Sequence, residues 1–304
     1  MFTDKPILIT GLPRSGTTWV GRMIAQVPSV RYIHEPFNIS NWQCACGIDF
    51  EYWFRYISQE NEANFYQHFV HTFGPAFNRF NLLNVLIEMR ATRRLRPLIN
   101  YARSLKASRV LIKDPLAIFS TEWLATKFDM DVIVVIRHPA AIVSSYKRLN
   151  WSHSFSQFLA QPLLMKDHLH PFEAEIRDFA DNFYDIVDQA ALLWKLIYYQ
   201  VEKYQENHKN WLFVNYEELA HNPIDSFQTI FEKLNLEYTE RVSQALHIHS
   251  NSINPVNSSD PYSIKRDSKQ TILDWKKSLT SREIERIRTR VEDVASLFYS
   301  DDDW

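Results

Sequence analysis

Short apolar runs alternate with stretches of helical periodicity along most of the chain. The runs have the length and β-branched content of buried parallel strands, and they are Pro6–Thr10, Val30–Ile33, Arg109–Lys113, Asp131–Ile136 and Trp211–Asn215. Helical spacing follows four of them, at Thr17–Val27, Phe119–Lys127, Ala140–Leu149 and Pro223–Leu234. Strands that alternate with helices in this way predict an α/β fold built on a central parallel sheet.

Three later segments have patterns of their own. Asp181–Asn207 has the apolar spacing of one long helix, whereas the polar, proline-containing stretch Asn251–Lys269 predicts a loop. Ser281–Phe298 predicts another helix, which begins with a capping box at Ser281. These patterns place helices and a loop around the sheet but add no further strand.

Composition indicates an ordinary folded chain. Of the 304 residues 45% are hydrophobic and 14% aromatic, and 34 Lys and Arg nearly balance 36 Asp and Glu. These values exclude low-complexity disorder and remove any global attraction to nucleic acid. We find no internal repeat and predict a single domain, residues 1–304, with an aromatic-rich helical insertion at about 50–105.

Targeting signals are missing from the sequence. The apolar run at 6–10 is too short for the core of a signal peptide, and no apolar run is long enough to cross a membrane. We therefore expect a soluble, cytoplasmic protein.

The two cysteines, Cys44 and Cys46, exclude a disulfide framework. They suit either two half-buried thiols or a metal site, whose further ligands would come from the pairs His168 and His170 or His247 and His249. Since four ligands would have to converge from unrelated segments, we expect no metal.

A phosphate-binding loop is predicted between the first strand and its helix. The segment Gly11–Thr18 has the spacing G-x-x-x-x-G at the place where backbone amides and a helix N-terminus converge on an anion. Thr17 stands where such loops usually have Lys, and the basic residue is Arg14 inside the loop. A second basic position, Arg137, follows the strand at 131–136, and Ser145 stands eight residues after it. The forked guanidinium of Arg137 suits a phosphate, and a helix-borne hydroxyl complements it.

These motifs resemble the family of sulfotransferases that use 3′-phosphoadenosine 5′-phosphosulfate (PAPS). Pro13–Trp19 resembles the family's 5′-phosphosulfate loop, and Val134–Pro139 with Ser145 resembles the motif that holds the donor's 3′-phosphate. The resemblance implies a P-loop-type three-layer fold, PAPS as donor, PAP as product and no required metal. It also implies donor contacts from Arg14, Ser15, Gly16, Thr17, Thr18, Trp19, Arg137 and Ser145.

Three further positions fit the same resemblance. Lys113 matches a Lys that the family places near the bridging oxygen and the sulfonate, and Tyr216 matches a Tyr near the adenine. Lys265 and Arg266 resemble a late basic segment over the 3′-phosphate, although Asp267 replaces the family's following Gly. Solvated loop charges are the alternative for these last two residues, and a core position is the alternative for Trp19.

The catalytic base differs between branches of the family. Small-molecule enzymes use a His two residues after the Lys, but Pro115 stands at that position here. Tyrosyl-protein and many carbohydrate sulfotransferases use a Glu after the second strand, and Glu35 stands 21 residues after Arg14. We predict that Glu35 is the general base, provided that burial raises its pKa, with Arg14 and Lys113 stabilising the leaving phosphate. The alternatives are that Glu35 only pairs with Arg14 or Lys113, or that His34 or Asp114 is the base.

We expect the acceptor to bind between the segments at 50–103 and 150–170. The expected classes of acceptor are a glycan, a peptide tyrosine or a small molecule. The basic run from Arg90 to Arg109 fits either an acidic partner or a solvated helix face. No nucleic-acid motif accompanies the run, and a homo-oligomer is possible. Two other classes remain open: a P-loop kinase or NTPase, which would need the absent loop Lys, and a non-catalytic nucleotide-binding protein.

Overall fold

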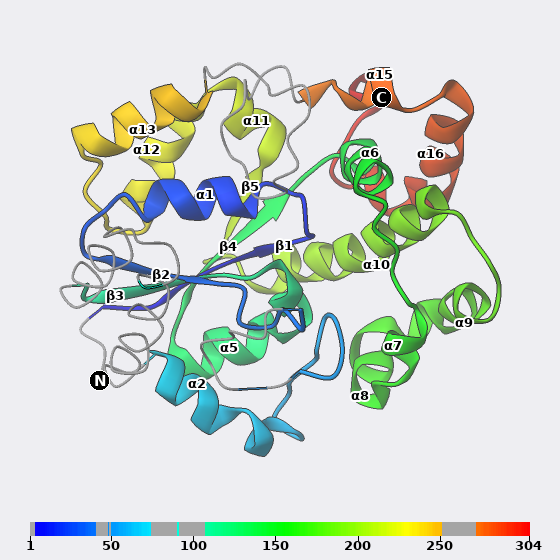
Figure 1. Cartoon of the computed structure of the whole chain (residues 1–304), viewed down its shortest axis with the longest axis horizontal. Helices are drawn as coiled ribbons and strands as arrows, with labels where there is room; N and C mark the ends of the chain where they lie inside the picture. The colour runs from blue at the N-terminus through cyan, green and yellow to red at the C-terminus, as the bar shows by residue number, and fades with distance from the viewer. Residues whose placement is uncertain (1–3, 41–47, 49, 74–89, 91–106, 251–271) are drawn as a thin grey trace.

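A parallel sheet forms the centre of the molecule (Figure 1). The structure is a computed structural model and describes residues 4–40, 48, 50–73, 90, 107–250 and 272–304. The described strands lie in the order β2-β3-β1-β4-β5. They are β1 (Ile7–Gly11), β2 (Val30–His34), β3 (Arg109–Lys113), β4 (Asp131–Ile136) and β5 (Leu212–Asn215). The predicted α/β fold with a central parallel sheet is confirmed, and each strand ends within one residue of its apolar run.

The register brings the carboxyl ends of the strands to one edge. In the central strand β1, Ile9 pairs with Lys113 of β3 and with Ile133 of β4. On the other side of β3, His34 of β2 pairs with Lys113. In an open parallel sheet, ligands bind at this edge, where the strands leave for their helices.

Helices cover both faces of the sheet and give the predicted three layers (Figure 1). On one face, a core cluster joins sheet residues such as Ile7 and Ile133 to the helices that begin at Thr17, Tyr216, Pro223 and Glu240. On the other face, a larger cluster joins residues such as Leu8 and Val134 to the helices that begin at Tyr66, Thr121, Pro139, Ile186 and Ser281. The strands are apolar on both sides, and both sides therefore pack against apolar side chains of the flanking helices.

The helix bounds follow the capping and proline signals of the sequence. The longer helices are α1 (Thr17–Ile24), α2 (Tyr66–Phe73), α5 (Thr121–Phe128), α6 (Pro139–Leu149), α9 (Glu173–Asp181), α10 (Ile186–Asn207), α11 (Tyr216–His221), α12 (Pro223–Lys233), α13 (Glu240–Ser250) and α16 (Ser281–Ala295). The short helices are α7 (Ser156–Leu159), α8 (Pro162–Leu164) and α15 (Trp275–Ser278). Short 3₁₀-helical segments are η1 (Glu62–Asn64), η2 (Pro115–Ser120), η4 (His170–Phe172) and η5 (Asp301–Asp303), and η3 (Met165–Leu169) is a short π-helical segment.

The long helix predicted over 181–207 is confirmed as α10, but its start is wrong by about five residues. α9 ends at Asp181, and α10 begins at Ile186 after an extended turn. Asp185 is the N-cap of α10, and its carboxylate accepts a hydrogen bond of 3.0 Å from the amide of Asp188. The N-cap bond stabilises a new helix start at a point where the apolar period alone suggests continuity.

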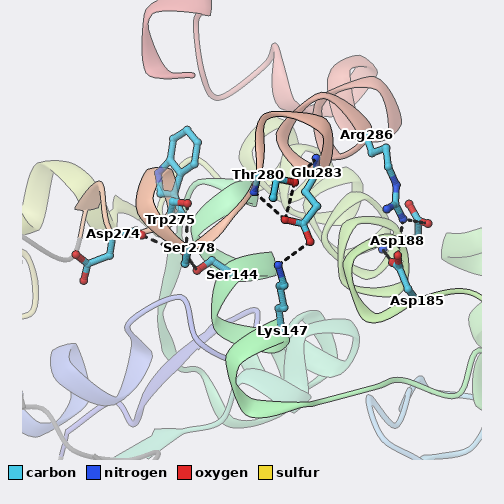
Figure 2. Close-up of polar contacts among 10 residues, drawn as sticks. All are labelled: Ser144, Lys147, Asp185, Asp188, Asp274, Trp275, Ser278, Thr280, Glu283 and Arg286. Atoms are coloured by element: carbon cyan, nitrogen blue, oxygen red, sulfur yellow. Dashed lines mark hydrogen bonds and ion pairs between the residues drawn. The ribbon is translucent and has the colours of Figure 1, made fainter. Parts of the chain in front are cut away.

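The capping box of the last long helix lies one residue earlier than predicted. Thr280, not Ser281, is the N-cap: its hydroxyl accepts from the amide of Glu283, and the Glu283 carboxylate accepts from the amide of Thr280. Glu283 also pairs with Lys147 of α6 at 2.6 Å (Figure 2). The same side chain therefore caps α16 and attaches it to α6.

Other polar contacts attach α15 and α16 to the body of the molecule (Figure 2). The Arg286 guanidinium lies 2.8 Å from the carboxylate of Asp185 and also pairs with Asp188, both at the start of α10. The hydroxyls of Ser144 on α6 and Ser278 on α15 are 2.6 Å apart. Within the described ranges, no helix is both long and apolar enough to span a membrane.

Candidate functional site

The loop between β1 and α1 has the backbone of an anion-binding turn. Gly11 and Gly16 have φ values of 145° and 105°, in a region that favours glycine. A Cβ on Gly16 would also collide with the ring of Tyr216. The loop turns back through a 3.0 Å bond from the amide of Ser15 to the carbonyl of Leu12. Both glycines of the motif are therefore required by geometry.

The N-terminus of α1 is open to an anion. It has no acidic residue in its first turn and no side-chain cap. Thr17 and Thr18 form the start of this helix, where unsatisfied amides and the helix dipole favour negative charge. The Oγ of Ser15 and the Nε1 of Trp19 are buried without a hydrogen-bond partner among the described residues. A ligand with several acceptor oxygens suits such a set of donors.

Arg14, Arg137 and Ser145 meet at this loop, although 131 positions separate the first and the last. The Nε of Arg14 donates a 3.0 Å bond to the Ser145 hydroxyl. The Arg137 guanidinium donates a 2.8 Å bond to the carbonyl of Arg14 and lies 4.1 Å from the centre of the Tyr216 ring. The three residues that the sequence assigned to the donor's phosphates are thus brought together.

The backbone of Arg137 is fixed by α10 and α11. Its amide donates to the Tyr198 hydroxyl at 2.9 Å, and its carbonyl accepts from the Trp194 indole at 3.0 Å. The following amide, of His138, donates to the Glu217 carboxylate at 3.1 Å. This support holds the guanidinium beside the loop without relying on a bound ligand.

Trp19 lies in the core rather than on an open surface. Its ring packs edge-on against Tyr216 at 6.0 Å and against Phe227 at 5.5 Å, and the residue is 6% exposed. Stacking of Trp19 or Tyr216 on an adenine remains a prediction.

Glu35 and Lys113 form a buried ion pair next to the loop. The Lys113 ammonium contacts Glu35 Oε1, and the Asn38 amide donates a 2.7 Å bond to Glu35 Oε2. The amide of Glu35 donates to the carbonyl of Lys113 at 2.9 Å, which continues the β2–β3 pairing by one bond. Both oxygens of the carboxylate are therefore held in fixed positions.

The expectation that burial raises the Glu35 pKa is wrong for the protein as described here. Burial does raise that pKa, but the Lys113 charge, the nearby His34 and the bonds from Lys113 and Asn38 outweigh it, and the net pKa is lowered. Burial lowers the pKa of Lys113, and Glu35 opposes that decrease. Glu35 is ionised at neutral pH and is a weaker base than an isolated buried carboxylate.

Asp114 and His34 are less suited to proton transfer than Glu35. The Asp114 carboxylate accepts bonds from the amides of Phe37 and Leu116 at 2.6 and 2.9 Å, so it supports the turn. Burial, together with the field of Lys113, lowers the pKa of His34 to about 4. The ring is therefore neutral at pH 7, with its Nδ1 3.2 Å from the Tyr32 hydroxyl.

The loop and the carboxylate open into one cavity of about 610 Å³. Arg14, Thr17 and Thr18 line it together with Glu35. Its other walls come from Trp53 and Phe54, and from 150–154 and Gln157 after α6. A carboxylate that faces the same space as an anion-binding loop can take a proton from a group that attacks the bound anion.

Comparison with known proteins agrees with this geometry. The profile of the sulfotransferase family matches residues 6–240. The chain belongs to the sulfotransferase family. Its five-stranded parallel sheet and flanking helices are the fold of that family.

Solved structures of low sequence identity share the fold. One is a sulfotransferase domain from the Synechococcus PCC 7002 olefin synthase, with 16% identity over 94% of this chain and 95% of that one and a TM-score of 0.50. Another is a sulfotransferase domain from the curacin biosynthetic pathway, with 14% identity over 96% of this chain and 99% of that one and a TM-score of 0.51. The search for curated relatives gave no match.

Several predicted positions of this sulfotransferase lie outside the described residues: Lys265, Arg266, Cys44, Cys46 and most of the run at 90–109. Arg109, at the end of that run, is neither solvated nor open to a partner. It is buried, donates to the carbonyl of Lys5 at 2.6 Å and pairs with Asp131. Among the described side chains, no group of three or more His, Cys, Asp or Glu residues is arranged to hold a metal.

Sequence reasoning missed several residues of the site. Asn38 follows Glu35 by three positions, but its bond to the carboxylate depends on a turn that no periodicity predicts. Trp151 and His153 line the cavity from a connection between α6 and α7 that has no helical or strand pattern. The sequence placed the acceptor between 50–103 and 150–170, and residues of both segments do line the cavity.

Proposed function

We propose that this sulfotransferase moves a sulfuryl group from PAPS to a hydroxyl or amine of an acceptor, by in-line transfer with Glu35 as general base. One observation carries the proposal: the anion-binding loop and the fixed Glu35 carboxylate line the same cavity. Glu35 therefore lies where an acceptor must approach a group held by the loop.

The described residues fit the donor. The α1 amides, Thr17 and Thr18 suit the 5′-phosphate and the sulfonate, because they form an uncapped helix N-terminus. Arg137 and Ser145 suit a second phosphate, since both bond to Arg14 and the Arg137 guanidinium lies over the ring of Tyr216. These assignments give PAPS as the donor and PAP as the product.

The transfer step balances without further reactants. The acceptor oxygen attacks the sulfur while its proton passes to Glu35, and the bond from sulfur to the bridging oxygen breaks with its electron pair remaining on the 5′-phosphate. Lys113, Arg14 and the loop amides stabilise the charge that develops there. Protonation neutralises Glu35, so the Lys113 ammonium loses its counter-ion as the leaving phosphate becomes more negative. The Glu35–Lys113 pair thus couples the proton transfer to the departure of the phosphate.

Glu35→Gln tests the proposal directly. We expect kcat for sulfate transfer from labelled PAPS to fall by about a hundredfold or more, because general bases contribute that much, while the Kd for PAP stays within about twofold. Glu60→Gln is the matched control, since the Glu60 carboxylate is 61% exposed and lies 3.6 Å from Lys166, away from the cavity lining. Loss of PAP affinity in parallel with kcat would show that Glu35 is structural and would refute its role as the base.

A further inference from the structure

The described lining of the cavity contains few charges. Its charged side chains are Arg14 and Glu35, and the proposed chemistry uses both. The other polar groups are uncharged amides, hydroxyls and one imidazole, including Asn38, Asn150 and Gln157. An acceptor with a carboxylate or sulfate away from its reacting hydroxyl would meet no counter-ion in this lining, and a buried, unpaired charge is strongly unfavourable.

Apolar groups form much of the remaining wall. Trp53, Phe54, Trp151 and Leu193 come from three different parts of the chain and face the same space. Large flat side chains of this kind bind ring systems through contact area and stacking. Side-chain bonds fix the segment that carries the first two, since the amide of Trp53 donates to Gln157 at 2.9 Å. This wall is therefore preformed.

His153 adds one hydrogen-bonding group to the apolar wall. Its ring packs against Phe54, Phe155 and Phe158, with centroids 5.5, 5.2 and 4.7 Å away. Its Nε2 is buried and has no hydrogen-bond partner among the described residues. Burial lowers the pKa of His153 to about 3, so the ring is uncharged at neutral pH.

We infer that the acceptor is an uncharged hydroxyl compound with an apolar, ring-containing body, and that His153 is a specificity-determining residue that hydrogen-bonds a second polar group of that compound. The inference rests on the proposed function and narrows the range of acceptors that this function allows. It predicts that polyanionic glycans and acidic tyrosine peptides are poorer substrates than such a compound. A buried nitrogen that gains a partner only from the ligand discriminates strongly between ligands with and without that partner.

Sulfate transfer to a panel of acceptors tests the class. The probes are a biphenyl monophenol, a heparan-type oligosaccharide and a tyrosine peptide flanked by aspartates, each measured after PAP binding has been established by titration. We expect kcat/KM for the monophenol to exceed that of either anionic probe by at least about a hundredfold. Equal or better use of an anionic probe, or no turnover of the monophenol by protein that binds PAP, would overturn the inference and leave the donor assignment intact. Failure to bind PAP would instead count against the proposed function itself.

A second comparison tests His153. In the wild type, a biphenyl diol should be used better than the monophenol, and His153→Phe should reduce kcat/KM for the diol by about tenfold while changing the monophenol by less than about twofold. His168→Phe is the matched control, because the ring of His168 also packs against aromatic side chains, those of Tyr56 and Phe119, but lies outside the cavity lining. Equal losses for both biphenyls in His153→Phe, with PAP affinity unchanged, would mean that His153 only packs the wall.

Discussion

Four non-glycine residues of the cavity wall have left-handed backbones. Arg14, Glu35, Phe54 and Asn150 have φ values of 78°, 44°, 56° and 53°. Asn tolerates this conformation and ends α6 with it, whereas Arg, Glu and Phe adopt it at a cost of about 1–2 kcal/mol each. At Glu35 and Arg14, hydrogen bonds fix the turn by engaging the amide of the first and the carbonyl of the second. Two of the four strained positions, Arg14 and Glu35, carry the groups that the proposed chemistry uses.

The Glu35–Lys113 pair gives a specific pH profile. Glu35 acts as a base only when ionised, and since its pKa is lowered, kcat/KM is lost only when pH falls below the usual range of a glutamate. Lys113 acts only when protonated, and since its pKa is also lowered, kcat/KM is lost as pH rises through a value below 10.5. We therefore expect kcat/KM to fall on the acidic side below pH 4.5, the ordinary value of a glutamate, and on the basic side at a pH below 10.5, the ordinary value of a lysine.

Asn38→Ala should move the acidic limb of this profile to higher pH, because it removes a bond that favours the charged form of Glu35. Two results would contradict the claim that Lys113 and Asn38 lower the Glu35 pKa. One is an acidic limb near pH 6 in the wild type, and the other is an acidic limb that stays at the same pH in Asn38→Ala.

At the scale of elements, the bounds of the strands could be predicted from the sequence, whereas the residues at which some helices begin could not. A buried parallel strand such as β3 or β4 is apolar throughout, so its ends can be read from the sequence. The start of α10 depends on the cap made by Asp185, and the prediction from the sequence placed this start about five residues too early. Thr280 and Ser281 both fit a cap, and only the bond to Glu283 identifies Thr280.

Gly16→Ala tests whether the loop between β1 and α1 contacts the donor. The added Cβ would collide with the Tyr216 ring, and alanine is strained at φ 105°, so the loop must change shape. We expect the Kd for PAP to rise by at least about tenfold while circular dichroism shows a folded protein. Unchanged PAP affinity in this variant would show that the loop does not contact the donor.

Thr280→Ala tests the attachment of α16. Loss of the capping hydroxyl should lower the free energy of unfolding by about 1 kcal/mol in urea titrations and leave PAP affinity unchanged. Thr229→Ala is the matched control, because that exposed hydroxyl only bonds a carbonyl one turn earlier in its own helix, and its effect should stay within about 0.5 kcal/mol. A destabilisation by Thr280→Ala no larger than that of the control would contradict the role of the cap.

At the scale of the molecule, each strand of the sheet delivers one residue to the site. Arg14 follows β1, Glu35 follows β2, Lys113 ends β3, Arg137 follows β4 and Tyr216 follows β5. Parallel strands bring these ends to one edge, so motifs at strand ends were enough to predict that these residues lie near one another. For the cavity wall proposed to face the acceptor, the sequence predicted only the two segments and not the residues. These residues lie in irregular connections, and their contacts depend on the folded chain.

The most direct test of donor recognition is calorimetric titration of PAP beside ATP, both with a chelator present. We expect micromolar binding of PAP and much weaker binding of ATP, because the proposed site assigns Arg137 and Ser145 to a 3′-phosphate that ATP lacks and requires no metal. ATP binding that is tight and appears only after addition of Mg²⁺, with no binding of PAP, would contradict the account and favour a P-loop kinase or NTPase.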